Sequence, residues 1–167
     1  MGRNACLILV LGLVAAGCSA TTIGARVLDA ETRQPVSGAV ILGVWSQLVC
    51  RLLCVHEHVG VRETESDGDG RFALERLPSS GYDGEGDGQA ITVYKFGYVA
   101  WSNLFIFPSS RQREDQGIPR EVLLERFPPG ESHRKHMYFI GNAIGGGYGI
   151  DAIPRFHRAI QRERNLP

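Results

Sequence analysis

The central part of the chain alternates between short apolar runs and clusters of turn residues. In one run Phe72 and Leu74 alternate with polar or small neighbours, which is the period of two expected for a strand with one buried face. Seven segments of strand-like character are 23–28, 36–45, 59–66, 71–77, 90–94, 99–107 and 119–127. No segment of helical periodicity separates them. The pattern therefore predicts an all-β domain over residues 18–127, a seven-stranded antiparallel β-sandwich.

Two segments inside this domain differ from plain strands. Residues 47–60 form an insertion whose apolar run is compatible with a helical turn or an irregular strand, because periodicity does not decide so short a run. Residues 79–88 are rich in glycine and acidic side chains. We expect this second segment to be a surface loop.

After residue 128 the pattern changes. Residues 128–167 are predicted to be a C-terminal extension with a glycine-rich connector over 145–149 and one short helix, which Pro154 starts. Ile153, Phe156 and Ile160 are spaced so that they share one helical face. This apolar stripe predicts that the helix docks onto the sandwich.

The first residues have the composition of an export signal. Arg3 precedes an apolar run that is shorter than the roughly 20 residues a membrane-spanning helix needs, and small residues stand before Cys18. The segment resembles a bacterial lipoprotein signal, so we expect residues 1–17 to be a signal peptide and Cys18 to be lipidated. Serine directly after the cysteine, here Ser19, resembles the sorting signal of lipoproteins sent to the outer membrane. We therefore expect the protein to be anchored there, facing the periplasm or the cell surface. Ordinary secretion and an uncleaved anchor are the alternatives.

Charge limits the kinds of partner. The chain has 18 basic and 18 acidic side chains, and removal of residues 1–17 takes only Arg3 from this balance. A nearly neutral mature chain lacks the concentrated positive surface that phosphate binding needs. We therefore expect no nucleic-acid partner.

Three stretches resemble the carboxypeptidase regulatory-like domain, an Ig-like, transthyretin-like (prealbumin-like) β-sandwich. They are 24–40, 63–72 and 94–98, in the order that the family has. In metallocarboxypeptidases this domain accompanies a zinc catalytic domain and is not itself the catalyst, and no His-x-x-Glu occurs in this chain. The resemblance thus implies no enzyme activity and no cofactor. Turn or core positions are Gly38, Asp67, Gly70, Phe72, Gly97 and Tyr98.

Cysteine and histidine cluster at 50–58. On an extended strand Cys54, His56 and His58 project to one face, and thiolate with imidazole suits zinc or copper. A disulfide between Cys50 and Cys54 is a second alternative. It needs Cα atoms about 4.4 to 6.8 Å apart, which a looped or helical pair meets and an extended strand does not. Free thiols at both positions are the third.

Together these patterns predict a non-catalytic, lipid-anchored cell-envelope protein. Its sandwich presents loops to another envelope protein or to a glycan, and the lipid on Cys18 makes the membrane a further partner. The alternative is a metal-binding envelope lipoprotein that holds zinc or copper with the 50–58 cluster. Candidate contact aromatics are Trp45, Tyr82, Tyr98 and Trp101.

Overall fold

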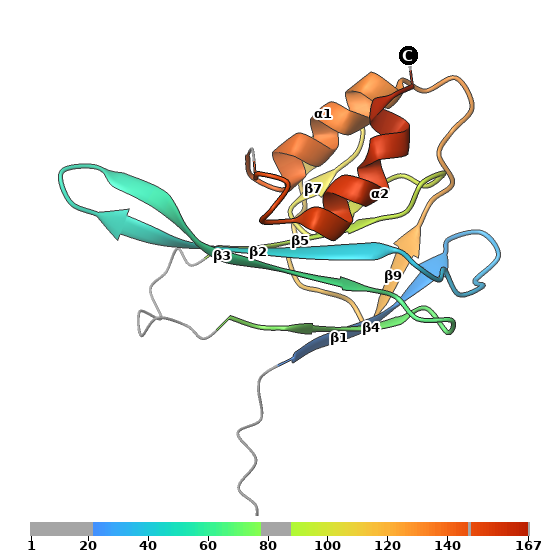
Figure 1. The fold of residues 1–167 in the computed structure, drawn as a ribbon, viewed down its shortest axis with the longest axis horizontal. Coiled ribbons are helices and arrows are strands. Elements are labelled where there is room, and N and C mark those ends of the chain that lie inside the picture. Colours follow the sequence, from blue (N-terminus) through green and yellow to red (C-terminus); the bar gives the residue numbers. More distant parts are fainter. Residues whose placement is uncertain (1–21, 78–87, 147, 167) are drawn as a thin grey trace, which may run out of the picture.

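Two layers of β-sheet lie under a pair of helices (Figure 1). The computed structural model describes residues 22–77, 88–146 and 148–166, without the side chain of His56. This part of the chain is mostly β, with helices only near the C-terminal end. Its elements are β1 (Thr22–Asp29), β2 (Val40–Cys50), β3 (Cys54–Glu65), β4 (Arg71–Glu75), β5 (Gly88–Tyr94), β6 (Trp101–Ser102), β7 (Phe105–Ile106), β8 (Arg111–Gln112), β9 (Glu121–Leu124), α1 (His133–Ala143) and α2 (Pro154–Arg164).

Within the described residues the strands pair into a three-stranded sheet, a four-stranded sheet and a short hairpin. Their orders are β4-β1-β9, β3-β2-β5-β6 and β7-β8. β1 is antiparallel to β4 but parallel to β9, where Val27 lies opposite Val122. The expectation of a purely antiparallel fold is therefore wrong at this edge. Periodicity reports the face that a side chain takes, and it carries no information on the direction of the neighbouring strand.

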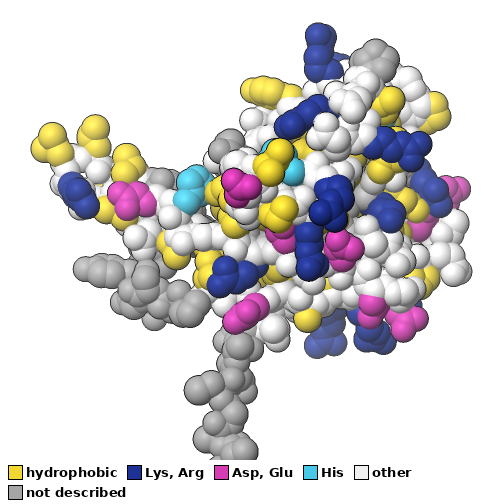
Figure 2. Space-filling model, in the orientation of Figure 1, with side chains coloured by type: hydrophobic (Ala, Val, Ile, Leu, Met, Phe, Trp, Pro, Cys, Tyr) yellow, Lys and Arg dark blue, Asp and Glu magenta, His cyan; other side chains and the backbone are white. Residues whose placement is uncertain are grey.

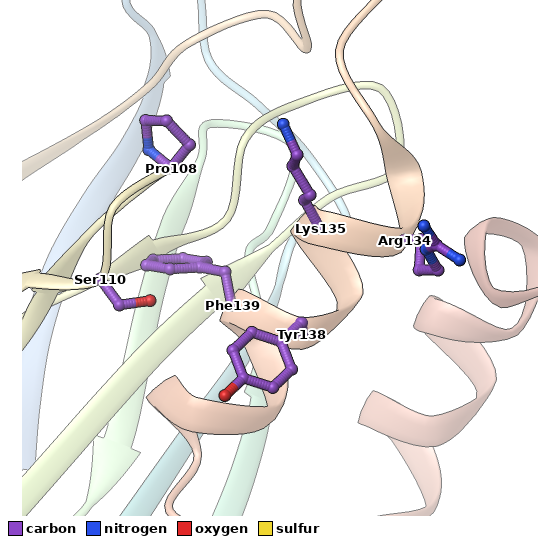
Figure 3. A pocket seen from close by; sticks show the side chains of 6 residues that line it. All are labelled: Pro108, Ser110, Arg134, Lys135, Tyr138 and Phe139. Atoms are coloured by element: carbon purple, nitrogen blue, oxygen red, sulfur yellow. The ribbon is translucent and has the colours of Figure 1, made fainter.

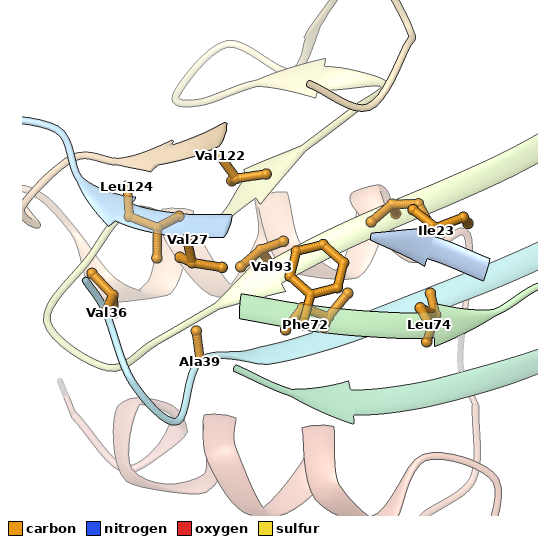
Figure 4. Close-up of a cluster of buried hydrophobic side chains, with 11 residues drawn as sticks. Ile23, Val27, Val36, Ala39, Phe72, Leu74, Val93, Val122 and Leu124 are labelled. Carbon is orange, nitrogen blue, oxygen red and sulfur yellow. The ribbon is translucent and has the colours of Figure 1, made fainter. Parts of the chain in front are cut away.

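The first hydrophobic core lies between the two larger sheets (Figure 4). Phe72 on β4 is only 5% exposed in this core. Burial of such a ring contributes about 1.5–3 kcal/mol relative to leaving it in water. The buried members are Ile23, Val27, Val36, Ala39, Ile41, Phe72, Leu74, Ile91, Val93, Val122 and Leu124.

The second core lies on the other face of the four-stranded sheet, under α1 and α2. Ile153, Phe156 and Ile160 are at most 4% exposed there, so the predicted docking of this stripe is confirmed. β2 is buried on both faces, because Ile41 belongs to the first core and Leu42 to the second. The sheet between the cores therefore forms the rigid centre of the molecule.

The prediction of a single helix in the C-terminal extension is wrong, because α1 precedes α2. α1 begins after Ser132, whose hydroxyl accepts the N–H of Lys135 at 3.3 Å. His136 is polar by type, and its place in the buried stripe hides the helical period that the apolar members would show alone. The buried members of α1 are His136, Phe139, Ile140 and Ala143.

The predicted strand 99–107 is interrupted, and β8 lies in the stretch between this strand and the next predicted strand. The hydroxyl of Ser102 accepts the N–H groups of Leu104 at 3.1 Å and Phe105 at 3.4 Å. A side chain that bonds the backbone in this way competes with the strand ladder. β6 therefore ends at Ser102 and the chain resumes as the β7–β8 hairpin.

The turn between β3 and β4 sets β4 beside β1. Asp67 Oδ1 accepts the N–H groups of Asp69 at 3.0 Å and Arg71 at 2.8 Å. Gly70 has φ +75°, and a Cβ at this position would lie 2.4 Å from the carbonyl oxygen of Val27. The turn thus requires a glycine both for its backbone angle and for the close approach of β1.

Candidate functional site

β2 and β3 continue beyond the sheet as a two-stranded arm (Figure 1). Among the described residues β5 pairs with β2 as far as Ser46–Gly88, and the ladder described beyond this pair consists of β2 and β3. We call residues 47–57 the arm and residues 51–53 its tip. The choice between a helical turn and a strand that the sequence left open is resolved in favour of strands on both sides of the tip.

A disulfide closes the arm. Cys50 and Cys54 lie opposite each other in the β2–β3 register and are bonded, with Cα atoms 4.0 Å apart, which is slightly closer than the usual range. The tip reverses the chain between them and so brings together two residues that a continuous strand would separate. A two-stranded ribbon is marginally stable in water. The cross-link stabilises it by removing open conformations of the chain.

Exposed aliphatic side chains lie at the far end of the arm. The exposed fraction is 96% for Leu52, 77% for Leu53 and 51% for Val55. Figure 2 shows the yellow hydrophobic side chains gathered there. Scattered apolar residues are ordinary on a protein surface, but a group of them on a protruding element is typical of a surface that another molecule covers. The arm is therefore the leading contact site among the described residues.

The base of the arm is tied to the helical layer. Tyr148 lies between α1 and α2, and its hydroxyl is 2.6 Å from Nδ1 of His58 in a hydrogen bond. The two rings meet edge to face, with centroids 5.1 Å apart. His157 on α2 holds the carbonyl oxygen of Tyr148 through Nε2 at 3.0 Å. These contacts orient the arm on the body, and no sequence pattern marked Tyr148 for this role.

The residues predicted to bind a metal are occupied otherwise. The sulfur atoms of Cys50 and Cys54 are bonded to each other, and His58 is held by Tyr148. The side chain of His56 lies outside what the structure describes. Among the described residues no group of three His, Cys, Asp or Glu side chains is placed to hold a metal ion. A zinc or copper site would require reduction of the disulfide, and it stays a prediction.

A buried carboxylate joins both helices to the sheet. Glu163 on α2 is 2% exposed. Its Oε1 accepts the Nδ1–H groups of His133 at 2.8 Å and His136 at 2.7 Å, and its Oε2 accepts the hydroxyl of Tyr94 at 2.8 Å. His136 Nε2 accepts the N–H of Ala100 at 2.8 Å, which places the proton of this ring on Nδ1. Both ring nitrogens of His136 therefore make hydrogen bonds within the protein.

The pKa values of Glu163 and Tyr94 are shifted in the directions that keep this hydrogen-bonded cluster together. Burial opposes ionisation of Glu163, but the hydrogen bonds from His136 and His133 outweigh it and lower the pKa of the carboxyl below its usual value. Burial and the bond to Glu163 raise the pKa of Tyr94, so the phenol keeps its proton and remains a donor. In this cluster the ionised carboxylate of Glu163 is thus surrounded by groups that donate hydrogen bonds to it.

A second buried carboxylate fixes the turn after β1. Asp29 Oδ1 accepts the N–H groups of Thr32 at 3.0 Å and Glu31 at 3.1 Å. Its Oδ2 accepts the hydroxyl of Tyr98 at 3.0 Å and Nε of Arg126 at 2.7 Å. The hydrogen bond from Thr32 contributes most to lowering the pKa of Asp29 well below its usual range. Tyr98, predicted as a contact residue, thus has a structural hydrogen bond.

The remaining predicted contact aromatics also pack against the body or cannot be placed. Trp45 and Trp101 are partly buried against the first core, and the guanidinium of Arg113 lies 5.4 Å from the centroid of Trp101. Tyr82 and the predicted lipidation site Cys18 lie outside the described residues. The described tryptophans thus contribute to packing.

A shallow pocket beside α1 is a second candidate contact site (Figure 3). Its volume is about 360 Å³. Tyr138 on its wall is 72% exposed, whereas Phe139 is 1% exposed. Tyrosine and arginine are enriched in protein interfaces, so this composition suits a protein contact. The pocket is lined by Pro108, Ser110, Arg134, Lys135, Tyr138 and Phe139.

The helices and the comparisons with known proteins bear on the membrane and on relatives of the chain. Within the described residues no helix has the length and apolar character needed to cross a bilayer. The resemblance to the carboxypeptidase regulatory-like domain stays a prediction, since the chain matches no protein-family model, no curated protein and no solved structure.

Proposed function

We propose that this protein is a non-catalytic, lipid-anchored protein of the cell envelope that contacts another envelope component through its arm. The observation that carries the proposal is the exposure of Leu52 and Leu53 at the end of a disulfide-closed hairpin. Apolar surface on a protruding element is unfavourable in water and becomes favourable when it is covered. The lipid on Cys18 would hold the body at the outer membrane.

The buried polar groups support a structural body in place of an active site. Asp29, His136 and Glu163 use their hydrogen-bonding atoms on neighbours within the same chain. A general base or nucleophile needs a free atom that a substrate can approach. The two carboxylates therefore account for their own burial without a reaction.

The finer fold is part of the proposal. Residues 18–127 would be a carboxypeptidase regulatory-like domain with a transthyretin-like β-sandwich, and residues 128–167 an extension that covers one sheet. In support, the two larger sheets of the described chain contain seven strands, and the Asp67 turn has the hydrogen bonds expected of a tight reversal. The parallel β1–β9 ladder is a departure from a simple antiparallel sandwich.

The composition of the arm favours some partners over others. Residues 47–57 contain no Phe, Tyr or Trp, and they include four exposed aliphatic side chains, Leu48, Leu52, Leu53 and Val55. The candidate contact aromatics Trp45 and Trp101 lie outside the arm and are partly buried. The arm therefore suits an apolar partner better than a sugar.

The anchor is tested by Cys18→Ser in the full chain, followed by separation of membrane and soluble fractions. We expect the protein to leave the membrane fraction, because the thiol that carries the lipid is gone. Retention of this variant in membranes would point to an uncleaved anchor.

The arm is tested in cells by replacing Leu52 with the photoreactive residue p-benzoylphenylalanine. Gln34 receives the same replacement as a matched control, because it is exposed in the turn at the opposite end of β1. We expect irradiation to give adducts at position 52 and few at position 34, resolved by mass spectrometry. A correctly localised protein without an adduct at position 52 would contradict the proposal.

A further inference from the structure

The arm and the start of β1 lie at the same end of the molecule. β3 runs from the tip toward the Asp67 turn, β4 returns, and β1 is antiparallel to β4, with Thr22 opposite Glu75. Gly60 at the base of the arm lies close to Leu77 just after β4, where a Cβ on the glycine would be 2.8 Å from the leucine side chain. β1 therefore begins on the side of the body from which the arm projects (Figure 1).

The span from Cys18 to Thr22 and the reach of the arm are comparable in length. Thr22 follows Cys18 by four positions in the sequence, which allows a span of at most about 14 Å. Cys54 and Gly60 are six positions apart on β3, which gives the arm a reach of about 20 Å beyond its base. A single bilayer surface can therefore meet both the lipid on Cys18 and the tip of the arm when the body is tilted toward it.

The chemistry of the tip suits lipid. Leu52 and Leu53 are the most exposed large apolar side chains of the described protein, at 96% and 77%. Arg51 beside them has a long aliphatic stem, so its charged end can remain at the headgroups while the leucines enter the hydrocarbon. Arg51 and Glu57 are the only Lys, Arg, Asp or Glu residues in the arm, so its formal charge is zero with neutral histidine. Attraction to the membrane would thus come from apolar burial.

We propose that the tip of the arm inserts into the bilayer that carries the lipid on Cys18, as a second attachment point. This inference rests on the proposed function and names the bilayer as the component that the arm contacts. The lipid keeps the tip at a high effective concentration near the membrane, so even a small apolar tip is enough to engage. Two attachment points restrict the orientation of the body more than a single attachment point does.

The test uses the full lipidated chain in phosphatidylcholine vesicles whose acyl chains carry bromine. Leu52→Trp places a fluorophore at the tip, and Gln34→Trp places a matched one at the far end, both above the background of Trp45 and Trp101. We expect bromine to quench the added emission at position 52 severalfold more than that at position 34. The excess should persist in 1 M NaCl, because apolar insertion is not screened by salt.

Equal quenching at the two positions, or an excess that high salt abolishes, would overturn insertion of the leucines. A photo-adduct of position 52 with a second copy of this chain or with another protein, together with equal quenching, would overturn the lipid inference and leave the contact role of the arm intact. Adducts with lipid in cells and excess quenching in vesicles would support both. A correctly localised protein with no adduct at position 52 and no excess quenching would overturn both.

Discussion

Glu163 shows at the residue scale how this protein handles a buried charge. A carboxylate inside a protein is costly unless several donors satisfy it. Here the donors are His133, His136 and Tyr94, which come from α1 and β5 while the carboxylate belongs to α2. One side chain therefore holds the helical layer against the sheet from which the arm extends.

Glu163→Gln should lower the free energy of unfolding at pH 7 by about 1–3 kcal/mol, because an amide leaves at least one buried donor unsatisfied. The folded pKa of Glu163 lies below the usual 4.5. Its stabilising effect is therefore fully present above that value and is lost as the pH falls through the folded pKa. Denaturant unfolding between pH 7 and pH 3 should show that the variant loses less stability in acid than the parent does.

Glu75→Gln changes an exposed carboxylate and is the matched control. Its unfolding free energy should follow that of the parent at every pH. An equally steep acid loss in Glu163→Gln and in the parent would show that this carboxylate does not drive the pH dependence.

Some of these residues were readable from the sequence and some were not. Phe72 and the Asp67 turn lie in local patterns, alternation in one case and turn chemistry in the other. Glu163 stands in a run of charged helix residues and looks like a solvated side chain, because its partners are 27 to 69 positions away. Tyr148 pairs with His58 over 90 positions for the same reason. Such contacts depend on the tertiary fold and leave no local pattern.

At the scale of elements, the arm extends a strand whose first half is fully buried. Residues 40–44 of β2 are buried between the two cores, and the same strand continues to Cys50 in the arm. The tip is therefore joined to the centre of the body by a continuous ladder with β3. A contact made by Leu52 and Leu53 would be made by a positioned element and not by a free loop.

Cys50→Ser with Cys54→Ser should loosen the arm and leave the body intact. For so short a loop, the cross-link contributes about 2 kcal/mol. Opening of the arm should become roughly 30-fold easier without it. Limited trypsin digestion should then cut after Arg51 correspondingly faster, while cutting after Arg33 in the turn beyond β1 should not change. The midpoint of denaturant unfolding of the body should shift little, because both cores lie outside the arm.

Unchanged cleavage after Arg51 would show that the hairpin does not need its disulfide. A large loss of stability in the body would show instead that the arm and the cores unfold as one unit.

The elements differ in how far their sequence specifies them. Strands with one buried face were predictable, since alternation and flanking turns are local. The parallel direction of β9 was not, because it depends on the route of the chain from β6. α1 was hidden by His136 in its buried stripe. The sequence of the arm indicated possible metal ligands among its cysteines and histidines, whereas the structure indicates a contact surface at the exposed leucines of the tip.

At the scale of the whole molecule, a two-core body carries a protruding apolar arm on the side where the N-terminal segment joins it. The first core lies between the sheets and the second lies under the helices. This division leaves the four-stranded sheet covered on both faces, and only its β2–β3 extension reaches beyond the cover (Figure 1). The arrangement fits a protein held at a surface and touching that surface, or a neighbour on it, at one point.

The most direct measurement compares two candidate contact surfaces on the full chain in living cells. p-Benzoylphenylalanine replaces Leu52 at the tip in one variant and Tyr138 at the α1 pocket in the other, since both side chains are more than two-thirds exposed. The account predicts that position 52 gives most of the adducts after irradiation. Adducts at position 138 with none at position 52 would contradict it and would move the contact site to α1.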